Sequence, residues 1–299
     1  MSDKPTNVGG QAVIEGVMMR YKERLAIAVR CPNKEISLTE EKIQTLAKRW
    51  PILGLPIVRG SVSLVEAMVL GVKALTISAN KALDEEEEEL GSWALFLTVT
   101  SAISLAVGLF ILLPTIITGS LRPYLGRAIY LNISEGLMRV VLFLSYIFLI
   151  SRWEDMRRVF QYHGAEHKAI FCLEAGEPLT VANARRFTTL HPHCGTSFLL
   201  IVMIISIILF SFFGWPSLLQ RLLIRLVLLP LVAGLAYEGI RLAGRSKNPV
   251  VRYIMQPGLL LQRLTTAEPD DSQLEVALRA LEAVLANDTA APIKLAENR

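Results

Sequence analysis

An uninterrupted apolar stretch, Trp93–Thr118 (WALFLTVTSAISLAVGLFILLPTIIT), stands out in this chain of 299 residues. A helix of about 20 apolar residues crosses the hydrocarbon core of a bilayer, which is roughly 30 Å thick, so this stretch is long enough to span a membrane. The whole chain is 52% hydrophobic, with a mean hydropathy of +0.44, which is too apolar for a soluble domain of this size. The sequence therefore predicts an integral membrane protein.

Three further apolar stretches bring the prediction to about four transmembrane helices in a mainly α, polytopic membrane protein. These stretches are Ile129–Ile150, Ser197–Trp215 and Leu222–Ala243. The first of them contains Glu135 and Arg139, which are four residues apart. Side chains at this spacing lie on one face of a helix, so the two could form an ion pair.

Positive charge is distributed unevenly among the links between these spans. The segment before Trp93 carries twelve Lys and Arg residues, the link Ser151–Thr196 carries six, the tail from Arg241 carries eight, and the other two links carry three in all. Because Lys- and Arg-rich links stay in the cytoplasm, both termini and the central link are predicted to be cytoplasmic. No extended basic cluster with interleaved aromatic residues is present, so the predicted partner is the lipid bilayer and not a nucleic acid.

The segment from Ile57 to Ala79 is also long and apolar, but it carries Arg59, Glu66 and Lys73. Their regular spacing of seven residues places all three charges on one helix face. An amphipathic helix that lies on the membrane, or packs beside the bundle, is therefore favoured over a fifth span.

The two ends of the chain are predicted to form a small α+β cytoplasmic domain together. A capping-box pattern that begins at Ser37 predicts a helix ending near Trp50. After the last span, Asp271 or Ser272 could cap a helix with leucines along one stripe. Short strands are predicted over Ala12–Met19, Leu25–Arg30 and Glu35–Leu38.

These features divide the chain into six parts. They are a strand-rich N-terminal region (1–55), an amphipathic interfacial helix with an acidic linker (56–92), the first two spans (93–150), a histidine-rich cytoplasmic link (151–196), the last two spans (197–243), and a cytoplasmic tail with an amphipathic helix (244–299).

All four histidines of the protein fall within the central link. His163, Glu166 and His167 form an H-x-x-E-H pattern, in which two imidazoles one helical turn apart can bind one ion. Glu166 lies beside them, where it could orient or deprotonate a water molecule on that ion. This is the spacing found in zinc peptidases of the inverted-motif type.

A second group of metal-ligand residue types, His191, His193 and Cys194, directly precedes the third span. Two imidazoles and a thiol are good ligands for zinc or another late transition metal. Glu238, near the cytoplasmic end of the fourth span, offers a carboxylate at the same membrane face. The sequence thus predicts a site for a divalent transition metal, with zinc favoured, whose ligands come from these residues together with His163 and His167.

Each of these residues also has an explanation that needs no metal. The histidines could be solvated or lie beside lipid headgroups, and Glu238 could pair with Arg241 one helical turn later. Cys194 could be a small core residue. The three cysteines of the chain are far apart and odd in number, which argues against a disulfide framework.

The other unusual stretch is Gly9–Arg20 (GGQAVIEGVMMR). Its paired glycines allow a close approach of the backbone to other groups, and Glu15 and Arg20 are charged residues among apolar neighbours. A buried strand with glycine turns is the favoured explanation, and a contact with a substrate or a partner is the alternative.

Four motifs occur in this order along the chain: Gly9–Arg20, Tyr162–Lys168 (YHGAEHK), His191–Phe198 (HPHCGTSF) and Leu264–Pro269 (LTTAEP). Together they resemble the YqhQ-like family of bacterial membrane proteins, which is described as a domain of unknown function and as predicted metal-dependent enzymes. The resemblance extends over about Asn7 to Leu285, nearly the whole chain. It implies a multi-pass protein of the bacterial inner (cytoplasmic) membrane with a metal at His163, His167 and the His191–Cys194 group. It implies no substrate.

Three functional hypotheses follow. The first is a metal-dependent, hydrolytic membrane enzyme in which Glu166 acts as the general base. The second is a metal-binding or transport protein without catalysis, although the spans offer few polar residues to pass an ion. The third is a structural membrane adaptor whose terminal regions bind a cytoplasmic protein partner, and this hypothesis predicts no tightly bound metal.

Overall fold

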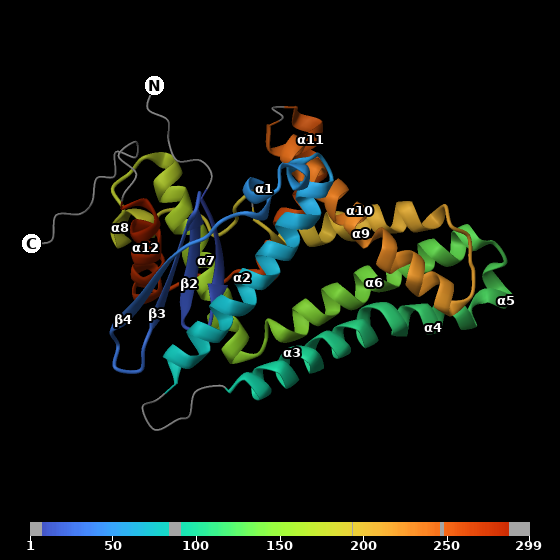
Figure 1. Ribbon diagram of the computed structural model, residues 1–299, viewed down its shortest axis with the longest axis horizontal. Helices are drawn as coiled ribbons and strands as arrows, with labels where there is room; N and C mark the ends of the chain where they lie inside the picture. The colour runs from blue at the N-terminus through green and yellow to red at the C-terminus, as the bar shows by residue number, and fades with distance from the viewer. Residues whose placement is uncertain (1–7, 84–90, 193, 246–247, 287–299) are drawn as a thin grey trace, which may run out of the picture.

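The computed structural model of the chain describes residues 8–83, 91–192, 194–245 and 248–286. These residues are mainly helical and contain a four-stranded antiparallel sheet with strands in the order β1-β2-β3-β4 (Figure 1). The strands are β1 (Val8–Val13), β2 (Gly16–Tyr21), β3 (Arg24–Arg30) and β4 (Ile36–Lys42). The helices are α1 (Leu46–Arg49), α2 (Val58–Ala82), α3 (Ser92–Val107), α4 (Leu113–Ser120), α5 (Arg122–Leu125), α6 (Ala128–Ile150), α7 (Glu154–Ala175), α8 (Val181–Ala184), α9 (Thr196–Ser211), α10 (Leu218–Arg245), α11 (Pro249–Thr265) and α12 (Asp271–Leu285).

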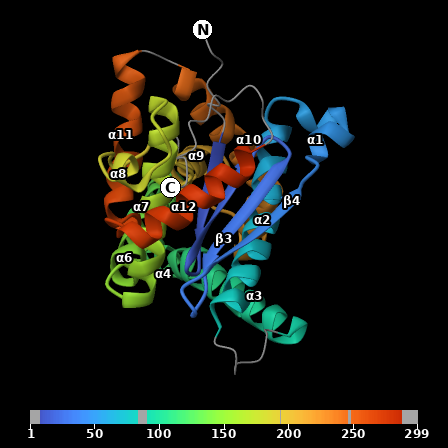
Figure 2. The ribbon, with the colours of Figure 1, turned by 90° about the vertical axis from the view of Figure 1, so that its left-hand side faces the viewer.

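The sheet is covered on both faces, because successive side chains of a strand point to opposite sides. Val17 and Met19 of β2 face a core formed with α7 and α12. Met18 of β2 and Ile27 of β3 face the other way, toward Ala74 of α2. Figure 2 shows α12 crossing one face of the sheet, with α2 on the far side.

The N-terminal strands and the C-terminal helix pack together as the sequence predicted. The leucine stripe of α12 is buried in the same core as β2 and β3. The helix begins after Asp270, whose side chain accepts the amide of Gln273, one residue before the predicted cap. The central link adds α7 to this core, so three distant parts of the chain form one α+β domain.

Two sequence predictions in the N-terminal region are wrong. The strand predicted over Ala12–Met19 is broken by a hairpin, in which Val13 pairs with Gly16 and Glu15 has a φ of 51°. The helix predicted from Ser37 is strand β4, and Ser37 pairs with Val29 of β3. Local capping signals are weak compared with the pairing of a strand beside an apolar sheet, so tertiary contacts decided this segment.

Among the described residues, four helices are long and apolar enough to cross a membrane. Two of them, α6 and α10, coincide with predicted spans. The first predicted span is the continuous helix Ser92–Ser120, which passes through a π-helical turn at Gly108–Leu112. Pro114 follows this turn and lacks an amide hydrogen, which accounts for the local change in hydrogen bonding.

The fourth candidate span is α2, in place of the predicted span Ser197–Trp215. That predicted span contains α9, which has 16 residues and is therefore about 24 Å long. The helix ends at Ser211 because Gly214 adopts a left-handed conformation (φ 66°) and Pro216 follows. Three of the four predicted spans are therefore long apolar helices, the remaining one is the shorter apolar helix α9, and α2 also meets the length and composition of a span.

The three charges of α2 lie on one face, as their spacing predicted. Arg59 binds Glu238, Glu66 binds Arg20, and Lys73 binds Glu41. This face packs against α10 and the sheet, as does Gly71, which touches the side chain of Gln11. Another face exposes an apolar stripe that consists of Val58, Val65, Met68, Val69, Val72 and Leu75.

Candidate metal centre

The H-x-x-E-H pattern lies in the buried middle of α7. Helix α7 begins four residues after α6 ends and passes beneath the sheet and α12, so residues from Tyr162 to Ile170 are largely buried. His163 and His167, one turn apart, face the connection that leads from α8 to α9 and the end of α11. The predicted helical placement of the two histidines is confirmed.

The side chains of His163, His167 and Cys194 converge. One ligand atom from each lies within 4.8 Å of the others, and the Nε2 atom of His163 is 3.3 Å from the Sγ atom of Cys194. The two imidazole rings are 4.4 Å apart, centre to centre. Two histidines from the middle of α7 and a cysteine from the loop before α9 therefore come together in space.

Both histidine rings are oriented by backbone carbonyl groups. The Nδ1 atom of His163 donates to the carbonyl oxygen of Thr265 at 2.8 Å, and that of His167 donates to the carbonyl oxygen of Thr189 at 2.5 Å. A carbonyl can only accept, so each ring carries its proton on Nδ1 and keeps a lone pair on Nε2. This arrangement is typical of histidines that bind metals, because the second hydrogen bond fixes the ring.

The donor set and its spacing fit zinc. Bonds of 2.0–2.1 Å to nitrogen and about 2.3 Å to sulfur place tetrahedral ligands roughly 3.4 Å apart. The separation of His163 Nε2 and Cys194 Sγ already has this value, and the other separations need to close by at most about 1.4 Å. If all three side chains bound a zinc ion, one tetrahedral position would stay free, as in catalytic zinc sites.

Glu166 is buried beside this group but faces the sheet. Its carboxyl accepts the amide of Gly10 in β1, and a methyl group at Gly10 would lie 2.8 Å from its oxygen. Burial raises the pKa of the Glu166 carboxyl, and this effect outweighs the opposing influences of His163, His191 and the Gly10 amide. Of the two glycines of the N-terminal motif, Gly10 thus makes room for this side chain, whereas nothing lies within 4 Å of a methyl group at Gly9.

The other predicted ligands lie elsewhere. The Nε2 atom of His191 is 3.4 Å from Glu174, and its ring lies 5.6 Å from that of His167. His193 lies outside the described residues. Glu238 is not brought to the three ligands, because Arg59 binds both of its carboxylate oxygens at 2.6 and 2.5 Å. The alternative pairing of Glu238 with Arg241 is replaced by this contact between α2 and α10.

Sequence reasoning missed the residues that support the site. Gln262 of α11 exchanges two 2.8 Å hydrogen bonds with the backbone of His191, and its side chain is fully buried. Gly164 allows the close approach of the segment after α11, since a methyl group there would lie 2.2 Å from the carbonyl oxygen of Ala267. The sequence identified Leu264–Pro269 as a motif, but it did not predict that the backbone of this segment packs closely on α7.

An apolar cavity of about 510 Å³ begins one turn beyond Cys194. Ser197, which lines it, donates its amide to the carbonyl oxygen of Cys194 at 3.2 Å. The other walls come from α9, α10 and α11 and include Ile201, Leu242 and Pro257. An apolar group of a ligand could therefore lie next to the three converging side chains.

Comparison with known proteins identifies relatives but no described activity. The family described as "protein of unknown function (DUF1385)" matches residues 55–287. The "uncharacterized protein YqhQ" of Bacillus subtilis (strain 168) is 32% identical over 295 residues, which cover 94% of this chain and 93% of the relative. No solved structure matches the chain.

Proposed function

We propose that this chain, which belongs to the DUF1385 family of proteins of unknown function, is a metal-dependent membrane hydrolase. The observation that carries the proposal is the convergence of His163, His167 and Cys194, with both rings held through Nδ1 so that Nε2 remains available. The favoured metal is zinc, since two imidazoles and a thiolate suit it. The protein would lie in the bacterial inner membrane with its termini and this site on the cytoplasmic side.

In this proposal the residues of the chain have separate tasks. A zinc ion, when bound, supplies Lewis acidity to the reacting group. Glu166 accepts the proton of the attacking water, for which its carboxyl turns from Gly10 toward the ligands one turn away. The cavity beyond Ser197 holds an apolar part of the substrate, so we expect the scissile bond to belong to a lipid-like or membrane-embedded molecule.

A second candidate function is metal binding without catalysis. The contact between Glu166 and the Gly10 amide favours it, because this contact holds the proposed base against β1 and not against His163, His167 and Cys194. Under this alternative Glu166 is a structural residue that joins α7 to β1.

Metal content is the first test. We expect about one zinc per purified chain, and we expect the His163→Ala/His167→Ala and Cys194→Ser variants to lose it. Cys31→Ser is the matched control, since Cys31 lies in a turn outside the group and its variant should keep the metal. A wild-type chain that binds no zinc or other transition metal would exclude both metal functions and favour the adaptor hypothesis.

Catalysis is tested separately with Glu166→Gln. The wild type and the variant are reconstituted in vesicles made from a total bacterial membrane extract. Mass spectrometry then detects hydrolysis products, as pairs of new molecules whose masses add up to that of a substrate plus one water. We expect the variant to keep its metal and to form at least about 100-fold less product, the usual contribution of a general base. Equal product patterns from both proteins would leave metal binding without catalysis as the function.

A further inference from the structure

A buried charge cluster joins α4, α6 and α10, whose neighbouring ends lie remote from the sheet in Figure 1. At its centre is Glu135 of α6, which is 1% exposed. One carboxylate oxygen accepts hydrogen bonds from Arg139 at 2.6 Å and Thr115 at 2.5 Å, and the other accepts from Arg225 at 2.6 Å. The predicted pairing of Glu135 with Arg139 is thus confirmed, and both oxygens are engaged.

Arg221 brings a third guanidinium group to this carboxylate without bonding to it. Its Nη1 atom is 3.8 Å from Glu135, and neither its Nε nor its Nη1 atom has a hydrogen-bond partner in the part of the chain that the structure describes. The residue is 9% exposed, and its guanidinium group lies 3.8 Å above the ring of Trp215. Three arginines around one carboxylate leave two positive charges in excess.

This excess charge is costly in an apolar bundle. An arginine stays protonated at any physiological pH, so it cannot relieve its burial by losing a proton. A buried cation without its own counterion loses much of its solvation, and unpaired N–H groups add to this cost. The cluster is therefore incomplete as an ion network and calls for an anion near Arg221.

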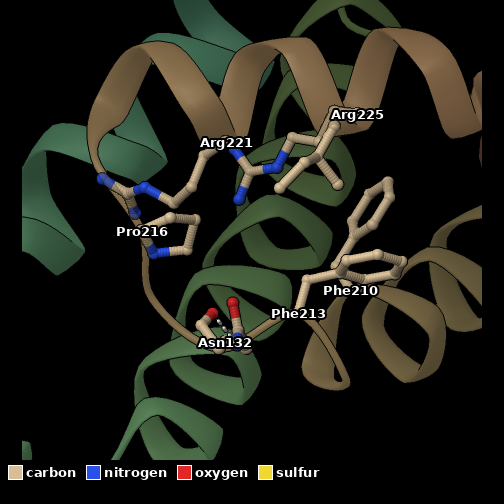
Figure 3. A pocket seen from close by; sticks show the side chains of 8 residues that line it. Asn132, Phe210, Phe213, Pro216, Arg221 and Arg225 are labelled. Carbon is tan, nitrogen blue, oxygen red and sulfur yellow. Dashed lines mark hydrogen bonds between the residues drawn. The ribbon is translucent and has the colours of Figure 1, made fainter.

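A small cavity lies where such an anion would bind. Figure 3 shows Arg221 and Arg225 projecting from α10 into the space between α10 and α6, with Phe210 and Phe213 on one side and Pro216 at its edge. Asn132 closes the floor through a 2.9 Å hydrogen bond to the carbonyl oxygen of Gly214. The space accepts a group the size of one water molecule, which corresponds to one oxygen of a larger anion.

We propose that Arg221 and Arg225 bind a phosphate oxygen of an anionic ligand at this end of the bundle. The planar fork of arginine matches phosphate oxygens and forms strong charge-assisted bonds with them. The cluster lies near the end of the continuous helix Ser92–Ser120 and in the first turns of α6 and α10, which is close to the depth of lipid headgroups if these helices cross the membrane. The phosphate can belong to a phospholipid or be free in solution.

The test measures thermal unfolding of the full chain in dodecyl maltoside with three probes. These are dihexanoyl phosphatidylglycerol, inorganic phosphate, and dihexanoyl glycerol, which has the same chains without the phosphate. We expect a saturable rise in Tm with a phosphate probe and none with dihexanoyl glycerol. A rise with phosphatidylglycerol alone identifies a lipid ligand, and an equal rise with inorganic phosphate identifies a free anion.

Variants separate binding from folding. Arg221→Gln should lower the affinity for the phosphate probe by about tenfold or more. Arg152→Gln, at the other end of α6, should leave this affinity unchanged. Glu135→Gln should lower Tm without ligand but strengthen binding of the probe, because it removes the competing carboxylate. Should Arg221→Gln fail to fold, Arg221→Lys keeps the charge and should bind with intermediate strength. Unchanged binding in the Arg221 variant, or no stabilisation of the wild type by either phosphate probe, would overturn the proposal.

Discussion

Gly164 controls how closely α7 approaches the segment that orients both histidines. An added methyl group would meet the carbonyl oxygen of Ala267 at 2.2 Å and the side chain of Thr189 at 3.1 Å. Alanine favours a helix over glycine by up to about 1 kcal/mol, but overpacking costs about 1–3 kcal/mol. The clash is with the backbone and cannot be relieved by a rotamer change. We therefore expect its cost to exceed the gain in helix propensity.

We therefore predict that Gly164→Ala lowers Tm and reduces the zinc content. Both follow because the carbonyl groups of Thr265 and Thr189 would move away from His163 and His167. Gly195→Ala is the control, since nothing lies within 4 Å of a methyl group there. Differential scanning fluorimetry and elemental analysis of the two variants check this, and a Gly164→Ala protein with normal metal content would contradict it.

Residue types alone identified two of the three converging side chains and several candidates for the third. The spacing of His163 and His167 was sufficient, because a helix places such residues on one face. Cys194 could be proposed only as one of four alternatives, since the fold decides which of them reaches the pair. The hydrogen bonds to the carbonyl groups of Thr189 and Thr265 could not be predicted, because every residue has a carbonyl group and no side-chain pattern indicates which ones accept a histidine.

At the scale of the element, the start of α12 depends on pH. Burial raises the pKa of Asp270, but hydrogen bonds from the Ser272 hydroxyl and from the amides of Gln273 and Ser272 bring it below its usual value of 3.8. A lowered folded-state pKa means that the cap stabilises fully above the unfolded-state pKa of about 3.9 and is lost as the pH falls through the folded-state value.

Two substitutions separate the cap from its charge. We expect Asp270→Ala to destabilise the domain by about 1 kcal/mol at pH 7, the usual value of an N-cap, and Asp270→Asn to keep the cap while removing its loss in acid. Asp271→Ala is the control, because its exposed ion pair with Arg185 should contribute little. Unfolding followed by circular dichroism between pH 3 and 7 provides the measurement. A full pH dependence in Asp270→Asn would refute this account.

The exposed stripe of α2 predicts how this helix meets the membrane. Val58, Val65 and Val72 are spaced by seven residues and are all exposed. We expect α2 to lie along the membrane surface, because its charged face packs on the sheet. Spin labels at these three positions should then lie at equal depth in the membrane. A helix that crosses the membrane would separate the first and last labels by about 21 Å. A label at Lys73, which faces Glu41, is the control and should be shielded from lipid.

Sequence patterns predicted the long elements better than the short ones. Helices α6 and α10 were evident because nothing but a membrane span or a buried core accounts for so many apolar residues in a row. The segment at Ser37 was mistaken because its capping pattern is local, whereas its pairing with Val29 depends on the rest of the sheet. Helix α9 was drawn too long since the apolar residues Phe212 and Phe213 continue past its end.

For the whole molecule, the fold supports one arrangement in the membrane. The N-terminal strands, α7 and α12 share a core, so the regions that contain them must lie on the same side. The distribution of Lys and Arg predicts that this side is the cytoplasm. Reporter fusions after Arg122, Ala175 and Ser217 test it, with Ala175 expected inside and the other two outside. An external signal at Ala175 would reverse the orientation of the protein.

The shared core also has a consequence for the way the protein is made. Val17 and Leu285 lie in one core but leave the ribosome 268 residues apart, which takes roughly 10–50 seconds at about 5–20 residues per second. During that time the apolar face of the sheet that α12 later covers remains open. A nascent chain of this kind needs a chaperone or the membrane surface to shield that face. A message truncated before codon 271 would yield a protein that is inserted but recognised by quality-control proteases.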